Sequence, residues 1–155
     1  MLTQIEVKRL FDYDPATGSL TWRVRAARNV FPGQRAGNLN RQVRIDYRAY
    51  LITDVIWLWM TGNLPVETID HKDHNHNNYS WGNLREATYG ENNANRRNYK
   101  SVGMKWVRQV KRAGWGYQVQ INGVPFRKSG FKTEQDAHDA AYALAKRLHG
   151  AFVQP

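Results

Sequence analysis

Between Ile69 and Asn93 the chain concentrates side chains that can bind a metal ion or move a proton. The stretch IDHKDHNHNNYSWGNLREATYGENN holds three His and six Asn, together with Asp70 and Asp73, and little that a core could bury. Carboxylate and amide oxygens are the ligands that hard cations such as Mg²⁺ prefer, and a neutral His beside such a cation can take a proton from water. Together with a basic surface that holds the substrate, these groups are the parts of a phosphodiester hydrolase.

Two other interpretations of the same stretch need no such chemistry. A segment rich in Asn, Asp and His is often a turn-rich surface loop, because these side chains bond readily to their own backbone. His71, His74 and His76 could also bind zinc, although the ligands are crowded and the chain has no Cys to complete a common zinc site. The spacing of the residues around the stretch is needed to choose among the three.

The elements before the stretch are predicted from local signals. Thr3 and Glu6 form a capping-box pattern that starts a short helix, with Leu2 placed as its hydrophobic staple. A Pro/Gly turn then leads into alternating apolar residues typical of a hairpin strand, and a second strand region is predicted over 43–52. Residues 54–61 are apolar on nearly every side and precede a Gly, which indicates a buried helix beside the segment of interest.

After residue 103 the pattern changes to three strands and a final helix. The strands are predicted over MKWVRQVKR, WGYQVQI and PFRKSGF, with turns between them. Thr133 caps the helix and Gly150 ends it. Its expected apolar stripe comprises Ala137, Ala140, Ala141, Leu144 and Leu148. Alternation in the middle strand divides Trp115, Tyr117, Val119 and Ile121, facing the helix, from Gly116, Gln118, Gln120 and Asn122, facing outward.

The distribution of charge separates these two zones. Residues 1–95 hold 11 Lys and Arg against 10 Asp and Glu, whereas residues 96–155 hold 12 against 3. A localised basic zone favours a polyanionic partner, most simply nucleic acid, although a solvated basic surface would have the same composition. The absence of Cys excludes disulfides and Cys nucleophiles. No apolar run approaches the roughly 20 residues needed to span a bilayer, and the N-terminus lacks the layout of a signal peptide. A cytoplasmic location and no membrane partner are therefore predicted.

The stretch VETIDHKDHNHNNYSWGNLREATYGENNANRR resembles the HNH nuclease family, especially its phage and intron homing-endonuclease branch. The matching features are the Asp-His pair at 70 and 71, Asn-Leu-Arg at 83–85, Ala-Thr at 87–88 and ENNANR at 91–96. The resemblance implies a ββα-metal motif at about 66–97, in which two strands are followed by a helix.

The resemblance also implies a role for individual residues. His71 would be the general base that activates water, and Asn83 would hold the loop so that the His71 ring keeps its orientation. Asp70 and Asn92 would be the metal ligands, with Asn93 and Asn95 close enough to leave the second ligand open. The implied cofactor is a divalent metal, most simply Mg²⁺ with Mn²⁺ as an alternative. His74 and His76 have no clear counterpart and are assigned to a solvated loop that could touch phosphate.

The basic tail, over roughly residues 100–153, resembles the Apetala-2/ethylene-response-factor DNA-binding domain. The matching residues are Ser101-Val102-Gly103, the alternating strand from Trp115, the Asn122-Gly123 turn, Gly130-Phe131 before Thr133, the Ala-rich helix and His149-Gly150. The resemblance implies a sheet that lies in the major groove of DNA. Gln can pair with adenine and Arg or Lys with guanine or phosphate, so the predicted DNA-binding residues are Arg108, Lys111, Arg112, Gln118, Gln120, Arg127 and Lys128.

The sequence is therefore interpreted as an α+β protein with an HNH nuclease domain over 1–98 and an Apetala-2/ERF-like domain over 99–155, a three-stranded antiparallel sheet packed on one helix. The predicted function is metal-dependent, homing-type cleavage of double-stranded DNA, one strand per active site. The sequence does not decide between a monomer and a homodimer. Two alternatives remain: a non-catalytic DNA-binding regulator that keeps the fold, and an RNA-binding or structural protein.

Overall fold

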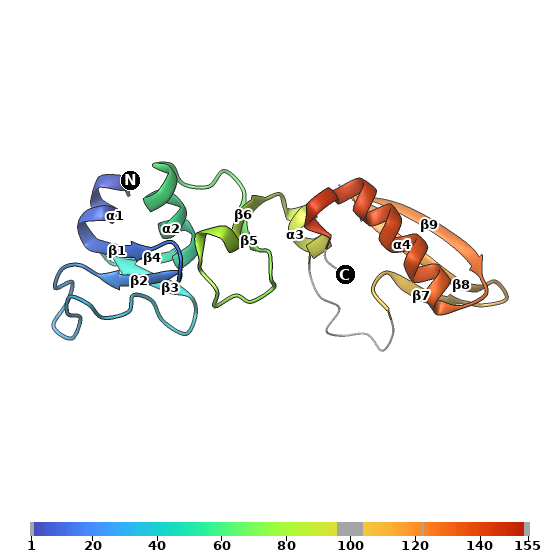
Figure 1. The fold of residues 1–155 in the computed structure, drawn as a ribbon, viewed down its shortest axis with the longest axis horizontal. Coiled ribbons are helices and arrows are strands. Elements are labelled where there is room, and N and C mark those ends of the chain that lie inside the picture. The colour runs from blue at the N-terminus through green and yellow to red at the C-terminus, as the bar shows by residue number, and fades with distance from the viewer. Residues whose placement is uncertain (1, 96–103, 122, 154–155) are drawn as a thin grey trace. The chain divides into compact units, whose positions relative to one another are not determined.

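The computed structural model describes residues 2–95, 104–121 and 123–153, and it divides the chain into two compact units, Met1–Glu86 and Ala87–Pro155 (Figure 1). The predicted boundary between residues 98 and 99 lies outside the described residues, as do Ser101-Val102-Gly103 and Asn122, and that boundary stays a prediction. Within the described ranges, none of the helices has the length and apolar character needed to cross a membrane.

The first unit begins with a short helix and a hairpin. Helix α1 (Gln4–Leu10) starts at Thr3, and the predicted capping box is present: the Thr3 hydroxyl accepts from the Glu6 amide, and the Glu6 carboxylate accepts from the Thr3 amide. Strands β1 (Phe11–Asp14) and β2 (Ser19–Trp22) then pair antiparallel, with alternate residues buried. The prediction of a short helix followed by a hairpin is confirmed.

The predicted strand region over 43–52 is two strands and the start of a helix. Strands β3 (Gln42–Ile45) and β4 (Arg48–Leu51) form a hairpin whose two-residue turn, Asp46 and Tyr47, has positive φ angles of 47° and 65°. Helix α2 (Ile52–Thr61) follows directly, starting two residues before the predicted start, and ends as predicted at Gly62 in the left-handed region. The chain therefore reverses direction at a turn that lacks the Gly by which such turns are usually recognised.

Two further strands follow, and their pairing carries the predicted site residues. Strand β5 (Thr68–His71) pairs with β6 (Leu84–Ala87), and the loop between them ends in the 3-10 turn η1 (Trp81–Asn83). Trp57 of α2 packs against Trp81 with ring centroids 5.0 Å apart, while Trp59 and Trp81 pack against the core formed by α1, α2 and the hairpins. These three tryptophans are therefore packing residues.

The second unit contains helix α3 (Tyr89–Asn95) and the three-stranded sheet. Strands β7 (Val107–Val110), β8 (Gly114–Ile121) and β9 (Val124–Phe131) pair antiparallel in that order, and helix α4 (Glu134–His149) covers one face, with the turn η2 (Gly150–Phe152) after it (Figure 1). The predicted sheet packed on one helix is confirmed.

Two details of the second unit differ from prediction. The fully buried row of α4 is Ala137, Ala141, Ala145 and His149, because every fourth residue faces the sheet, while Ala140, Leu144 and Leu148 are half-buried at its edge. Gly116 lies on the outward face as predicted, opposite Arg108, but it is buried there, because the backbone of β9 is so close that a Cβ would lie within 3 Å of the Lys128 carbonyl.

Candidate active site and nucleic-acid interface

Asp70 and His71 end strand β5, and both are buried, with 5% and 6% of their surface exposed. Arg85 on the paired strand β6 donates from Nε to Asp70 Oδ2 at 2.9 Å, and its Nη2 lies 2.8 Å from the same oxygen in an ion pair. A buried carboxylate needs such compensation, and the charge-assisted hydrogen bond also fixes its orientation. Arg85 therefore positions Asp70, a role that the sequence interpretation did not assign to it.

The His71 ring is surrounded by two other rings from the loop that follows it. His76 and Tyr79 both meet it edge to face, with centroids 5.2 and 5.7 Å away. Burial and the charge of His76 lower the pKa of His71 to about 4, against the opposing effect of Asp70 and Asp73. At neutral pH the imidazole is therefore uncharged, which is the form that can accept a proton.

Asn83 joins the two ends of the loop between β5 and β6. Its side-chain oxygen accepts from the Asp73 amide at 3.0 Å, and its side-chain nitrogen donates to Asp73 Oδ1 and to the Asn78 carbonyl, both at 2.9 Å. Its backbone adds bonds to Lys72 and Ser80. Asn83 thus holds the loop that carries His76 and Tyr79 against His71, and it contacts Asp73 rather than Asp70.

Asp73 is committed to the same loop. Burial opposes its ionisation, but hydrogen bonds from Asn78, the Asn75 amide and Asn83 outweigh this effect and lower its pKa. Both carboxylate oxygens of Asp73 are thereby occupied by protein donors. Asp73 therefore acts as a structural acceptor within the loop.

The first hairpin supports the loop from the other side. Tyr13 donates its hydroxyl to the Tyr79 carbonyl at 2.7 Å, and the Trp81 amide donates to the Pro15 carbonyl at 2.9 Å. Burial raises the pKa of Tyr13 to about 12, so this hydroxyl keeps its proton. Gly18 lies against the backbone of Tyr79 and Ser80, so closely that a Cβ would clash. Sequence reasoning missed this support, since residues 66 positions apart gave no local signal.

Asn92, Asn93 and Asn95 lie on α3 in the second unit. Thr88 and Glu91 form a capping box that starts this helix: the Glu91 carboxylate accepts from the Thr88 amide and hydroxyl at 2.8 and 2.7 Å. The Thr-x-x-Glu spacing is a signal that could have located this helix start. Asn92 is half-buried, Asn93 is exposed and Asn95 is buried.

The residues present suit a hard divalent cation better than zinc. In the part of the chain that the structure describes, no three His, Asp or Glu side chains gather into a metal-binding group, so His71, His74 and His76 do not form the alternative zinc site. Asp70 offers a buried carboxylate, and carboxylate oxygens are the donors that Mg²⁺ and Mn²⁺ prefer.

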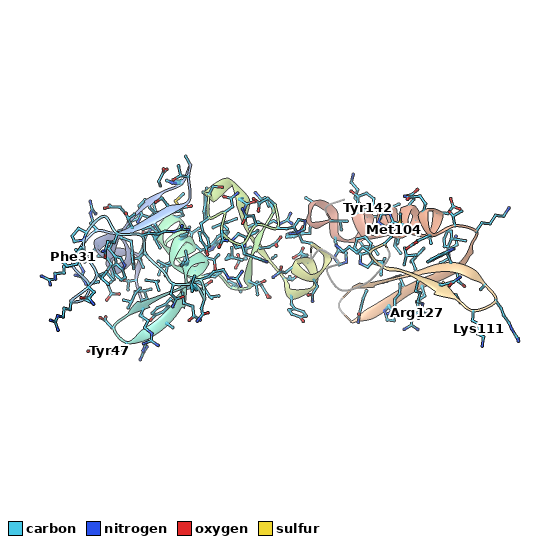
Figure 2. The ribbon with its side chains drawn as sticks, turned by 90° about the horizontal axis from the view of Figure 1, so that it is seen from below. Phe31, Tyr47, Met104, Lys111, Arg127 and Tyr142 are labelled. Carbon is cyan, nitrogen blue, oxygen red and sulfur yellow. The ribbon has the colours of Figure 1, made fainter. Side chains whose placement is uncertain are left out.

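The predicted DNA-binding residues all lie on the sheet of the second unit or its turns. Arg108 pairs with Gly116, and Arg127 with Gln118, so these side chains share the face opposite α4, and Figure 2 shows Arg127 and Lys111 on that side. Lys128 instead pairs with Tyr117 and emerges on the side of the helix. Gln118 accepts from Arg127 Nε at 3.0 Å and Gln120 donates to the Gly123 carbonyl at 3.0 Å, so both amides are partly engaged within the sheet.

Comparison with known proteins supports the interpretation of the first zone. Residues 52–94 match the family model described as HNH endonuclease. A protein of Acanthamoeba polyphaga mimivirus, described as an uncharacterized HNH endonuclease, is 31% identical over 99 residues, which cover 63% of this chain and 52% of that protein. The chain thus spans about half the length of the curated relative it matches. No solved structure matches it significantly. The predicted resemblance to HNH endonucleases is confirmed over this segment, and it supports a nuclease enzyme at family level.

Proposed function

We propose that the chain is a metal-dependent endonuclease that hydrolyses phosphodiester bonds in double-stranded DNA. The observation that carries the proposal is His71, a buried and uncharged imidazole that follows the carboxylate of Asp70 on β5, within a segment that matches HNH endonucleases. A neutral His next to a hard-cation ligand has the properties of the general base in such a reaction.

In the proposed reaction His71 takes a proton from water as the water oxygen attacks the phosphorus, and the bond to the leaving oxygen breaks. Burial lowers the pKa of His71 to about 4, so the imidazole is unprotonated at neutral pH. His76 and Tyr79 restrict the ring, and Asn83 restrains the loop that carries them. These contacts support the role of Asn83 as a positioning residue.

Asp70 and Asn92 are proposed to supply the carboxylate and amide oxygens that hold the metal. When bound there, Mg²⁺ or Mn²⁺ would stabilise negative charge on the phosphate and on the leaving oxygen. Arg85 fixes the Asp70 carboxylate and limits the cost of burying it.

The sheet β7–β8–β9 is proposed to bind DNA in the manner of an Apetala-2/ERF domain, giving the site preference of a homing-type enzyme. Arg108, Arg127, Gln118 and Gln120 would meet the groove from the face opposite α4, while Lys111 and Arg112 at the β7–β8 turn would meet phosphate. The bonds that engage the two glutamines can be exchanged for bonds to base edges.

The test is incubation of supercoiled plasmid with the full chain and Mg²⁺, Mn²⁺ or EDTA, followed by separation of nicked and linear DNA. We expect nicks with either metal and none with EDTA or with the His71→Ala variant. Nicks before linear DNA indicate one strand per site, and linear DNA without nicks indicates paired sites. Binding of DNA without cleavage under any metal would favour the non-catalytic regulator, and preference for RNA would favour the RNA-binding alternative.

A further inference from the structure

The first unit carries an arginine-rich surface that the charge balance of residues 1–95 conceals. Between residues 23 and 53 the basic residues are all Arg, and the acidic residue is Asp46. Every one of these arginines is exposed: Arg23, Arg25, Arg28, Arg35, Arg41, Arg44 and Arg48. The other acidic residues that balance them in the sum lie outside this segment.

These arginines have few anionic partners within the protein. In the described ranges, Arg23 is the member of the set with a carboxylate in salt-bridge distance, Asp12 at 3.4 Å. Arg25 lies 5.1 Å from the centre of the Phe31 ring and donates to the Arg28 carbonyl. A surface made of Arg rather than Lys suits phosphate and guanine, because the planar guanidinium bonds to them in a bidentate manner.

The surface is hollowed rather than flat. A cavity of about 340 Å³ opens between the loop after β2 and strand β3, with Trp22 in its wall and the guanidinium-bearing residues Arg35 and Arg44 along it. The amide side chains of Gln34, Asn38 and Gln42 also line it. Side chains of this kind donate to phosphate and sugar oxygens.

The surface is connected to the loop of the candidate site through the first hairpin. Arg35 pairs with Thr21 of β2 in an isolated bridge. The same hairpin contacts the loop after His71, since the Tyr13 hydroxyl donates to the Tyr79 carbonyl at 2.7 Å and Gly18 lies against the backbone of Tyr79 and Ser80. Arg35 therefore lies beside the hairpin that supports the site.

The β3–β4 hairpin extends the arginine surface away from Arg41. Four residues per strand carry its tip roughly 13 Å from Arg41, at about 3.3 Å per residue. At the tip Tyr47 takes a φ of 65°, a conformation that costs a bulky residue strain, and its side chain is fully exposed. Figure 2 shows it at the end of the hairpin. The two-residue turn requires this positive φ, and it leaves the Tyr47 ring exposed at the tip, where it can contact a partner.

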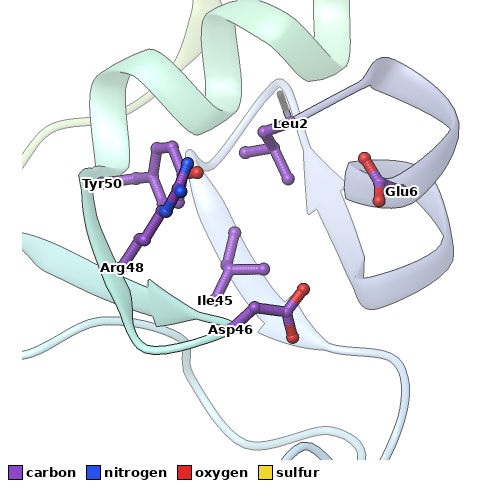
Figure 3. A pocket seen from close by; sticks show the side chains of 6 residues that line it. All are labelled: Leu2, Glu6, Ile45, Asp46, Arg48 and Tyr50. Carbon is purple, nitrogen blue, oxygen red and sulfur yellow. The ribbon is translucent and has the colours of Figure 1, made fainter.

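The other side of the hairpin, where Arg48 lies, carries acidic as well as basic side chains. A second cavity of about 330 Å³, between α1 and the hairpin, is lined by Glu6, Asp46 and Arg48 with three apolar or aromatic side chains (Figure 3). Its mixed charge does not favour a polyanion, and Glu6 is engaged in the capping box. The side with Arg35 and Arg44 is the one that suits nucleic acid.

We infer that this arginine surface is a second contact surface for duplex DNA, in which Arg35 and Arg41 contact phosphates and Tyr47 enters a groove. The inference rests on the proposed nuclease function for the identity of the polyanion. Duplex DNA is favoured because its major groove admits a two-stranded β-ribbon such as the β3–β4 hairpin, whereas the deep and narrow major groove of an RNA helix does not.

The experiment measures binding of the full chain to a labelled duplex in EDTA, where cleavage is not expected, over a range of salt concentrations. Arg35→Gln combined with Arg41→Gln removes two charges and keeps an unbranched polar side chain at each position. Lys8→Gln combined with Arg9→Gln removes two charges from α1, outside the surface, and is the matched control. Melting temperatures establish that each variant is folded.

We expect the Arg35/Arg41 variant to flatten the slope of log affinity against log salt by about 2, since each phosphate contact contributes about 0.9. The control should leave the slope unchanged. Tyr47→Gly should raise the melting temperature, because Gly relieves the strain, and yet weaken binding about tenfold without altering the slope, since a stacking or groove contact releases no counterions.

Equal salt slopes for the Arg35/Arg41 variant and its control would refute the claim that the arginine surface contacts DNA. Unchanged affinity of Tyr47→Gly would refute the claim that Tyr47 enters a groove. Tighter binding to single-stranded RNA, with the same loss of slope, would overturn duplex DNA as the partner. If the Arg35/Arg41 variant shows the expected smaller salt slope while the wild-type chain cuts no plasmid with any metal, the DNA contact surface is supported and the nuclease proposal is refuted.

Discussion

Replacing Gly18 by Ala should separate the contribution of the first hairpin to the site from its contribution to the fold. Gly18 has a φ of 77°, and an added Cβ would lie less than 3 Å from the backbone of Tyr79 and Ser80. Gly33 in the same unit has a φ of 84° with nothing within 4 Å of the same position. Gly33→Ala is therefore a control that shares the backbone strain and lacks the clash.

The expected losses of unfolding free energy follow from the backbone strain, which both variants share, and the steric clash, which only Gly18→Ala has. A left-handed backbone costs a residue other than Gly about 1–2 kcal/mol, which both variants should lose. Forcing extra volume against packed backbone typically costs about 1–3 kcal/mol more, which only Gly18→Ala should lose. Because the displaced backbone belongs to Tyr79, the contact of its ring with His71 should also be disturbed, and the cleavage rate should fall.

The assay is urea unfolding followed by tryptophan fluorescence, combined with single-turnover cleavage at saturating enzyme so that differences in binding do not enter. Gly18→Ala should unfold at lower urea than Gly33→Ala and cut more slowly. If the two variants are equally stable and equally active, the close approach between the hairpin and the loop does not position the site. If Gly18→Ala is less stable but cuts at the rate of Gly33→Ala, the hairpin supports the fold alone.

His71→Ala should lower the cleavage rate by about 10² to 10⁴ and leave DNA affinity in EDTA nearly unchanged; cleavage at the wild-type rate would refute its role as base. The folded pKa of His71 near 4 lies below the unfolded value of 6.5, so its contribution to stability is complete above pH 6.5 and is lost towards pH 4. In EDTA the unfolding free energy of the wild type should therefore fall more over this range than that of His71→Asn, and parallel curves would contradict the shift. Asn83→Ala, which loses three side-chain hydrogen bonds, should lower stability by about 2–4 kcal/mol together with activity, whereas full stability with no activity would indicate a direct catalytic role. Gln118→Ala with Gln120→Ala should relax sequence preference without changing the salt slope; an unchanged preference between specific and random duplexes would exclude these side chains from base recognition.

Local signals predicted much of the fold because the forces behind them act over a few residues. The capping box of Thr3 and Glu6, the stop at Gly62 and the cap at Thr133 each depend on neighbours in the chain. The sheet on one helix followed from alternation and helical periodicity. The turn at Asp46 and Tyr47 was missed as a turn because its residues take positive φ without the usual Gly.

The candidate site residues were identified by their spacing, but their environment could not be. Spacing distinguishes Asp70 and His71 from a surface loop only through a resemblance, and it says nothing about burial. The resemblance gave Asn83 a role in holding the loop, but only the structure shows that its hydrogen-bonding partner is Asp73. Alternation likewise places Gly116 on the outward face, but it does not show that the backbone of β9 covers this residue.

The sequence by itself determined which chemical groups this protein has and the local elements that carry them: Asp70 and His71 at a strand end, Thr88 and Glu91 at a helix start, and the basic charge of the tail. The tertiary structure decided what those groups can do. Arg85 reaches Asp70 across the strand pair, and burial beside His76 and Tyr79 makes His71 a neutral base. A pKa is set by neighbours in space and by exclusion of water, and these depend on contacts between residues far apart in the chain.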